Sequence, residues 1–122
     1  IESSASHNDS SLERLKIMMS YIQDNYATKL TLEDIASSAN ISSRECSRCF
    51  QNNIGQTPID YLNNLRVGKA AGMLVSGTKS ILEISEDCGF SSGSYFSKMF
   101  NKLMDCTPFE YRRQYRKNKI DP

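Results

Sequence analysis

Two cysteines three positions apart are the residues of this chain that most directly suggest chemistry. Cys46 and Cys49 have the Cys-X-X-Cys spacing that occurs in structural zinc sites and in thiol-disulfide catalysts. A zinc site usually takes paired ligands at both ends, whereas Cys88 and Cys106 stand far apart and the single histidine, His7, lies near the start of the chain. A thiol-active or zinc-binding protein therefore stays open as one hypothesis.

Other catalytic constellations are missing from the sequence. It contains no carboxylate pair, no Gly-rich phosphate loop and no nucleophile arrangement that includes a histidine. We therefore predict that the protein is not an enzyme and takes no cofactor.

Length and composition set the frame for these residues. The chain has 122 residues, of which 39% are hydrophobic, enough for one folded domain or two very small ones. No run approaches the roughly 20 apolar residues that span a bilayer, and the start lacks the pattern of a signal peptide. We expect a soluble, cytoplasmic protein with no membrane contact.

The two ends of the chain differ from its middle. The chain starts with Ile1 rather than Met, and residues 1–10, IESSASHNDS, are rich in Ser, Asn and Asp. This composition predicts a disordered linker cut from a longer chain, and hence a missing N-terminal domain. We assign residues 118–122 to a short tail.

Charge is unevenly distributed along the sequence. The net charge is only +1, but residues 91–120 hold seven cations against two acids, whereas residues 31–90 hold five cations against seven acids. Several of these acids stand near predicted helix starts, where they complement the helix dipole.

Helix starts are the clearest local signal. A Ser or Thr followed three residues later by an acid is the capping-box pattern, and Pro58 and Pro108 follow two of these residues directly, at the first helical position. The pattern occurs at Ser10/Glu13, Thr31/Asp34, Ser42/Glu45, Thr57/Asp60, Ser80/Glu83 and Thr107/Glu110, and Ser91/Ser92 offers a seventh start. No segment alternates apolar and polar residues, so we predict an all-α fold.

Seven helices follow from these starts. We expect them over residues 11–26, 31–38, 42–53, 57–75, 80–87, 92–103 and 107–117. The fourth is the longest, at about 28 Å if each residue rises 1.5 Å. Gly68 and Gly72 lie inside it, and close backbone packing would explain two residues that disfavour helix.

The chain contains an internal repeat. FQNNIGQTPIDY (50–61) and FNKLMDCTPFEY (100–111) match at a constant offset of 50, and Asn40 matches Gly89 at an offset of 49. Asn and Gly both tolerate the left-handed backbone of a tight turn. Each copy therefore reads as a short helix, a tight turn and a second helix, which is a helix-turn-helix.

The second helix of each copy has one apolar and one polar face. We place Cys46, Cys49, Phe50 and either Asn53 or Ile54 on the apolar face of the first copy. The matching face of the second copy holds Phe96, Met99, Phe100 and Leu103. Cys46 and Cys49 correspond to Phe96 and Met99, which predicts that both sulfurs are buried packing residues.

The polar faces carry the side chains that could read DNA. Short hydroxyl and amide groups beside a cation are the mixture that hydrogen-bonds base edges and phosphates in a major groove. In the first copy they are Arg44, Ser47, Arg48 and Gln51, and in the second Ser94, Ser97, Lys98 and Asn101. Two such faces in register are much stronger evidence than one.

Residues 11–117 resemble the DNA-binding domain of the AraC/XylS family of bacterial transcription regulators. The second copy, GFSSGSYFSKMFNKLMDCTPFEYR (89–112), is similar to the family signature, and RVGKAAGML (66–74) is similar to the linker helix of the family. Asp105 stands where a Gly is usual, and Asp tolerates that backbone better than most residues. Cys46 and Cys49 stand where larger aliphatic residues are common.

The resemblance implies a double helix-turn-helix domain. Its first helix-turn-helix would cover residues 31–54, a linker helix 57–75, the second helix-turn-helix 80–104 and a final helix 107–117. Both recognition helices would enter successive major grooves, about 34 Å apart, so that one chain reads an asymmetric double-stranded operator. It also implies a regulator, an activator that touches RNA polymerase, whose effector or dimerisation domain precedes this chain.

Individual roles follow from residue type. Arg44 and Arg48 are the expected base readers, with Ser47 and Gln51 beside them, while Gly93 would let the backbone approach DNA. Four more cations either hold phosphates or serve only the solubility of the surface: Lys102, Arg112, Arg113 and Arg116. Glu45 either caps its helix through Ser42 or accepts a hydrogen bond from cytosine. A helical protein-interaction module without DNA affinity is the remaining alternative.

Overall fold

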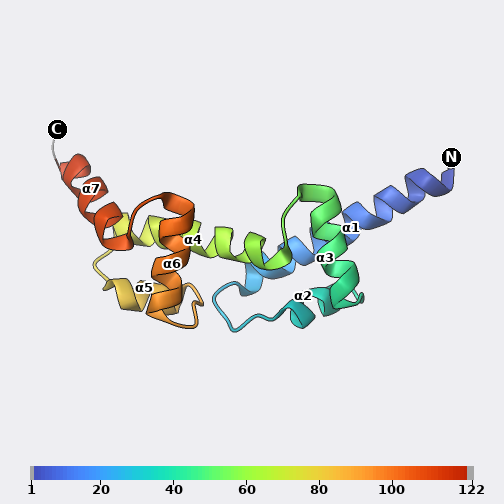
Figure 1. The fold of residues 1–122 in the computed structure, drawn as a ribbon, viewed down its shortest axis with the longest axis horizontal. Coiled ribbons are helices and arrows are strands. Elements are labelled where there is room, and N and C mark those ends of the chain that lie inside the picture. Colours follow the sequence, from blue (N-terminus) through green and yellow to red (C-terminus); the bar gives the residue numbers. More distant parts are fainter. Residues whose placement is uncertain (1, 121–122) are drawn as a thin grey trace. The chain divides into compact units, whose positions relative to one another are not determined.

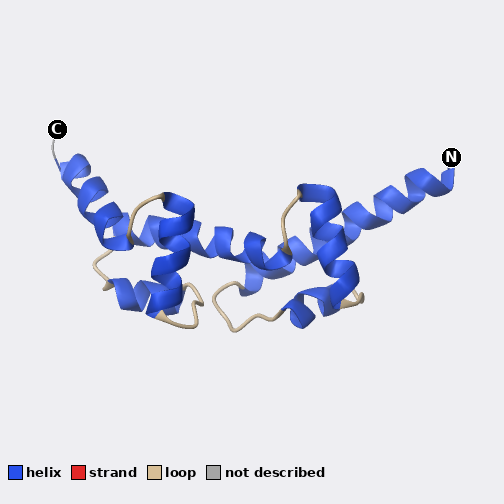
Figure 2. Cartoon of the chain, viewed as in Figure 1, coloured by secondary structure: helices blue, strands red, loops and turns tan. Residues whose placement is uncertain are grey.

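All regular structure in the described part of the chain is helical. The computed structural model describes the backbone of residues 2–120 and the side chains of residues 10–116, and it has helices and loops without a strand in this range (Figure 2). The helices are α1 (Glu2–Asn25), α2 (Leu32–Ser38), α3 (Ser43–Ile54), α4 (Pro58–Ser76), α5 (Ile81–Asp87), α6 (Gly93–Met104) and α7 (Pro108–Ile120) (Figure 1). The prediction of an all-α fold with seven helices is confirmed.

The helices form two compact units. One holds the chain up to Asn25 together with Leu30–Leu62, and the other holds Tyr26–Lys29 together with the chain from Asn63 onward. We call them the first and second units. Helix α4 passes from one to the other between Leu62 and Asn63.

Most helix starts lie where the capping pattern predicts them. Thr31, Ser42 and Ser80 form reciprocal capping boxes with the acids three residues on. The amide nitrogens of Asp60 and Glu110 likewise donate to Thr57 and Thr107, and the hydroxyl of Ser92 caps α6 by accepting from the backbone of Tyr95. These bonds satisfy amide groups that a helix start leaves without an intrahelical partner.

The first helix differs from its prediction. It begins at Glu2 rather than near residue 11, so Ser10 lies inside α1 and does not cap it. The hydrogen bonds of a helix lie within its own backbone, so a helix can extend beyond the residues that pack against another element. The apolar residues of α1 therefore do not show where this helix begins. At the other end, α7 continues to Ile120, beyond the predicted end at residue 117.

Left-handed residues stand at matching places in the two repeats. Asn40 (φ 58°) and Gly89 (φ 88°) occupy the turns inside the two helix-turn-helix motifs, as predicted. Gly55 (φ 66°) and Asp105 (φ 63°) end α3 and α6. Asp105 thus adopts the backbone for which glycine is the usual choice, with the same conformation as Gly55 one repeat earlier.

Helices α1, α2 and α3 pack against one another in the first unit. Their contacts bury Leu15, Met18, Ile22, Ile35, Ala36, Cys46, Cys49 and Phe50. Leu15, Met18 and Ile22 thus form the packing surface of α1. Among the described residues of this unit, the polar side chains of α3 that face away from this core, such as Arg44, Arg48 and Gln51, are exposed to solvent.

Aromatic rings fill the core of the second unit. Phe96 lies 4.9 Å from Phe90 and 5.7 Å from Phe100 between ring centroids, and Phe100 lies 5.4 Å from Tyr111. Val67, Ala70 and Leu74 of α4 and Ile84 of α5 close this cluster. Such contacts fix the orientation of α6, whose outer face is then available to solvent.

A buried arginine ties a loop into the second unit. Arg66 is 7% exposed, and its guanidinium donates to the backbone oxygens of Tyr26 (2.8 Å) and Thr28 (2.9 Å). The turn at Gly89 lies against the same loop, because a Cβ built there would be 2.3 Å from the oxygen of Tyr26. Backbone oxygens of residues 26–29 thus accept the bonds that hold this loop to α4.

Two packing expectations are wrong. Leu103 is 40% exposed rather than part of the apolar face of α6, since it lies in the last turn, beyond the helices that cover Phe96 and Phe100. Gly68 and Gly72 are exposed on α4, and a Cβ at either would meet nothing within 4 Å. Close packing therefore does not explain these glycines.

None of the described helices is both long and apolar enough to cross a lipid bilayer.

Candidate nucleic-acid interface

Helix α3 presents the polar face that the sequence predicts. Arg44, Arg48 and Gln51 are exposed and Ser47 is half-buried. Cys46 and Phe50, on the opposite face, are fully buried. The helical period places side chains three and four residues apart together, so the buried face of α3 determines which side chains face outward.

Helix α6 repeats this division in the second unit. Phe96 and Phe100 are fully buried. The exposed polar side chains include Ser94, Ser97, Lys98, Asn101 and Lys102, all of them predicted DNA contacts. Gly93 is half-buried, and a Cβ there would only touch Leu82 at 3.6 Å, so an alanine would fit within the protein itself.

The cysteines are packing residues in the structure. All four are free, and burial raises the pKa of Cys46 to about 11, with the neighbouring Cys49 adding to the rise. Burial also raises the pKa of Cys88 to about 11. Such thiols stay protonated at neutral pH and are poor nucleophiles and metal ligands.

A metal site is not found among the described side chains. These contain no group of three or more His, Cys, Asp or Glu residues that could hold an ion, and the side chain of His7 lies outside the described residues. The thiol of Cys49 instead donates a hydrogen bond to the backbone oxygen of Ser11, 3.3 Å away. The Cys-X-X-Cys spacing thus serves the contact between α3 and α1.

Glu45 has the capping role rather than a free carboxylate. Its Oε1 accepts from the backbone nitrogen of Ser42 (3.2 Å), and its own nitrogen donates to the Ser42 hydroxyl (3.1 Å). The hydrogen bond from the Ser42 backbone is the main cause that lowers the pKa of Glu45, and the charges of Arg14 and Arg48 lower it further. The carboxylate is therefore ionised and engaged.

The cations near the C-terminus have different surroundings. Arg112 is half-buried and donates from Nε to the backbone oxygen of Leu74 at 3.0 Å, and burial lowers the pKa of its guanidinium. The Nε bond packs α7 onto the end of α4, and the role of Arg112 as a phosphate contact stays a prediction. Arg113 is exposed with its guanidinium 6.0 Å from the ring centre of Phe109, and Lys102 is exposed on α6.

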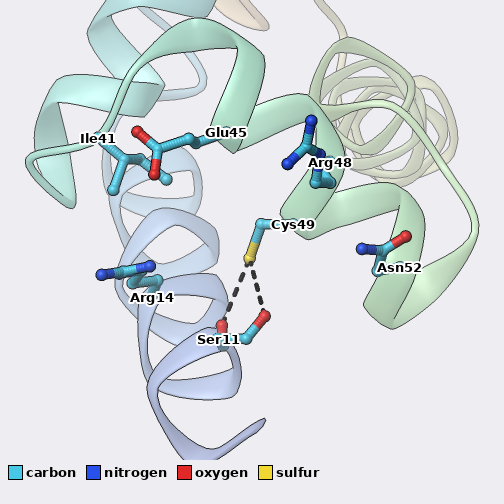
Figure 3. Close-up of a pocket in the computed structure, with 7 residues that line it drawn as sticks. All are labelled: Ser11, Arg14, Ile41, Glu45, Arg48, Cys49 and Asn52. Atoms are coloured by element: carbon cyan, nitrogen blue, oxygen red, sulfur yellow. Dashed lines mark hydrogen bonds between the residues drawn. The ribbon is translucent and has the colours of Figure 1, made fainter. Parts of the chain in front are cut away.

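A pocket beside α3 includes residues that the sequence did not single out. It has a volume of about 150 Å³ and lies between α1 and α3 (Figure 3). It is lined by Ser11, Arg14, Ile41, Glu45, Arg48, Cys49 and Asn52. Arg14 was missed because no local signal in the sequence indicates which residue of α1 lies beside α3.

A family model matches the part of the chain that carries both repeats. The model described as a helix-turn-helix domain covers residues 35–114. The chain belongs to the AraC/XylS family of DNA-binding transcription regulators. This family consists of DNA-binding proteins rather than enzymes, in agreement with the prediction from the sequence.

Individual relatives support the same assignment. The AraC-type chain is 36% identical over 100 residues to YdeC, an HTH-type transcriptional regulator of Bacillus subtilis, with 82% of this chain and 34% of YdeC covered. It is 32% identical over 109 residues to the HTH-type transcriptional activator RhaS of Citrobacter koseri, covering 89% of this chain and 38% of RhaS. The chain thus spans about a third of the length of these curated relatives.

A solved structure shows the same fold. The crystal structure of a transcriptional regulator with an AraC-type DNA-binding domain, from Chromobacterium violaceum, superposes with a TM-score of 0.79 at 33% identity. The match covers 92% of this chain and 96% of that one. An AraC-type domain with two helix-turn-helix motifs therefore accounts for nearly the whole chain.

Proposed function

We propose that this AraC-type chain binds a specific double-stranded DNA site with α3 and α6 in successive major grooves. The observation that supports this most is that both helices have one buried apolar face and one exposed polar face. Each buries an aromatic anchor, Phe50 or Phe100, and each exposes hydroxyl, amide and cationic side chains at matching positions. These are the groups that hydrogen-bond base edges and phosphates.

The continuity of α4 supports a two-groove site. Its 19 residues correspond to about 28 Å at 1.5 Å per residue, and they begin in the first unit and continue in the second. Successive major grooves on one side of a duplex are about 34 Å apart. Because the two recognition helices differ in sequence, the site they read is asymmetric.

The base readers are proposed from exposure and chemistry. Arg44 suits guanine and Gln51 suits adenine, since each pairs a two-pronged donor or amide group with a base edge. Arg48 stands at the edge of this face, beside Arg14 and Asn52. The second helix has smaller side chains, Ser94 and Ser97, beside Lys98, so it contributes more phosphate contact than base reading.

The biological role follows from the relatives. RhaS is named a transcriptional activator, which supports an activator that contacts RNA polymerase for the protein to which this chain belongs. This chain covers only about a third of the length of these curated relatives, which supports an effector or dimerisation domain elsewhere in that protein. A chromosomal regulator of a bacterium would act in the cytoplasm.

Selection from a library of random duplexes tests the proposed function. We expect enrichment of one asymmetric motif with two half-sites about one helical turn apart, and binding that weakens steeply with added salt. A palindromic motif would argue against reading by a single chain. Failure to enrich any motif, with no salt-dependent binding, would favour a helical protein-interaction module, for which the exposed Leu82 and Phe109 provide apolar surface.

A further inference from the structure

The pocket between α1 and α3 lies at the edge of the face that α3 presents to solvent. Arg48 and Asn52 of α3 line it from one side, and Arg14 of α1 lines it from the other (Figure 3). Arg48 also belongs to the polar face proposed to enter the major groove. The pocket is therefore next to the groove wall, where backbone phosphates lie.

The pocket is cationic. Its charged lining residues are Arg14, Glu45 and Arg48. Arg14 and Arg48 line the pocket together with Glu45, and the positive charge of each lowers the pKa of that carboxyl. That carboxylate accepts from the Ser42 backbone, so it partly offsets the two positive charges without forming an ion pair with either arginine among the described contacts.

Hydrogen bonds hold the two walls of the pocket together. The thiol of Cys49 donates to the backbone oxygen of Ser11, and Nδ2 of Asn53 donates to the Ser11 hydroxyl at 3.0 Å. Ser11 is one helical turn before Arg14, so these bonds fix the part of α1 that carries the arginine. A site whose groups are fixed before binding loses less entropy when the ligand arrives.

The geometry points to a phosphate clamp: Arg14 of α1, together with Arg48 and Asn52 of α3, holds one backbone phosphate of the bound duplex. The clamp rests on the proposed function and extends the DNA interface to a helix outside both helix-turn-helix motifs. Two guanidinium groups with an amide donor suit a phosphate, which accepts several charge-assisted hydrogen bonds at once. The pocket, with a volume of about 150 Å³, has room for a phosphate group.

Salt titrations of DNA binding test the clamp. We compare the wild-type chain, Arg14→Gln and Arg14→Lys on the duplex obtained by selection, with Lys16→Gln as the control. Lys16 is an exposed cation on the same helix that does not line the pocket, so its variant has the same net charge as Arg14→Gln. Arg14 is exposed, and matching melting curves verify that each variant is folded.

We expect Arg14→Gln to weaken binding on the order of tenfold at low salt and to lower the salt slope by about one. The ratio of the wild-type affinity to the affinity of Arg14→Gln should therefore fall by about three- to fourfold between 50 and 200 mM salt. The loss should be equal on every single-base variant of the site, since a phosphate carries no sequence information. Arg14→Lys should keep the wild-type slope.

Two results would overturn the clamp while leaving the proposed function intact. One is a salt slope for Arg14→Gln equal to that of Lys16→Gln. The other is a loss confined to one base pair, which would make Arg14 a base reader. A wild-type chain that binds no duplex would overturn both proposals.

Discussion

The two arginines of α3 have different surroundings at the scale of single side chains. Arg48 shares the pocket with Arg14, whereas Arg44 is exposed in the first turn of α3 and does not line that pocket. A guanidinium without a fixed partner is free to approach a guanine edge with two parallel hydrogen bonds. Arg44 is therefore the sharper test of base reading.

Replacing Arg44 should change sequence preference. We expect Arg44→Ala to cost about 1–3 kcal/mol of binding free energy and to relax the preference at one base pair, because the lost hydrogen bonds are specific to guanine. Binding to a panel of single-base variants measures this. The control is Arg113→Ala, which removes an exposed cation from α7. A loss from Arg44→Ala that is uniform across the panel would make Arg44 a phosphate contact.

A buried hydroxyl is a local weakness of the second unit. Ser85 is 1% exposed and its Oγ has no hydrogen-bond partner within the described residues, whereas the matching residue of the first repeat is the buried Ala36. A buried polar group without a partner keeps its full desolvation cost. Alanine, the residue at the matching position of the first repeat, would remove the unpaired hydroxyl at position 85.

Exchanging these two residues should move stability in opposite directions. We expect Ser85→Ala to raise the free energy of unfolding by about 1 kcal/mol, because the buried hydroxyl is removed without leaving a large cavity. The reciprocal change, Ala36→Ser, should lower it by about 1–3 kcal/mol. Urea denaturation measures both. A destabilising Ser85→Ala would show that the hydroxyl has a partner in solution.

Helix α4 contains two glycines in its interior. Gly68 and Gly72 are exposed in its interior, with open space where a side chain would go, whereas Gly89 stands in a left-handed turn against the oxygen of Tyr26. Glycine inside a helix loses more backbone entropy on folding than alanine does. The same residue type therefore weakens α4 and is required at the turn.

Alanine substitutions should separate these two cases. We expect Gly68→Ala and Gly72→Ala each to raise the free energy of unfolding by up to about 1 kcal/mol, through the helix propensity of alanine. Gly89→Ala is the contrasting variant and should destabilise by about 1–3 kcal/mol or more, since it combines a strained backbone with a clash. Thermal melts compare all three. A loss of stability in Gly68→Ala would show that its surroundings are closed in solution.

The predictable elements are those defined by local signals. Capping pairs such as Ser42/Glu45 and Ser80/Glu83 act over three residues, and the repeat assigned Cys46 and Cys49 to the buried face by their match to Phe96 and Met99. The start of α1 was not predictable, because a helix needs no side-chain signal to continue. The pocket was not predictable either, since it depends on which residue of α1 lies beside α3.

Arg66 connects two parts of the chain that lie far apart in the sequence. It is buried on α4, its charge is satisfied by the oxygens of Tyr26 and Thr28, and its guanidinium lies 5.8 Å from the ring centre of Phe90. Backbone oxygens are the same at every residue, so the sequence of the loop could not reveal this contact. A single side chain thereby fixes a loop that is distant in sequence.

Removing this side chain should loosen the loop and lower stability. We expect Arg66→Ala to cost about 3–5 kcal/mol of unfolding free energy, because it leaves a cavity and two backbone oxygens without their charged donor. Lys69→Ala, which removes a neighbouring exposed cation 5.7 Å from the ring centre of Tyr26, should cost less than about 1 kcal/mol. Hydrogen exchange of the amides in residues 26–29 should accelerate only in Arg66→Ala. Equal costs for the two variants would contradict a structural role for Arg66.

The loop also determines how the chain can be divided. Residues 26–29 stand between two helices of the first unit yet belong to the second, so neither unit is one uninterrupted segment of the gene. A chimera that exchanges residues 1–62 as one cassette would replace the loop that Arg66 holds, together with α3. An exchange limited to residues 30–62 leaves this loop with the second unit, which makes these residues the natural cassette for transplanting DNA specificity between relatives.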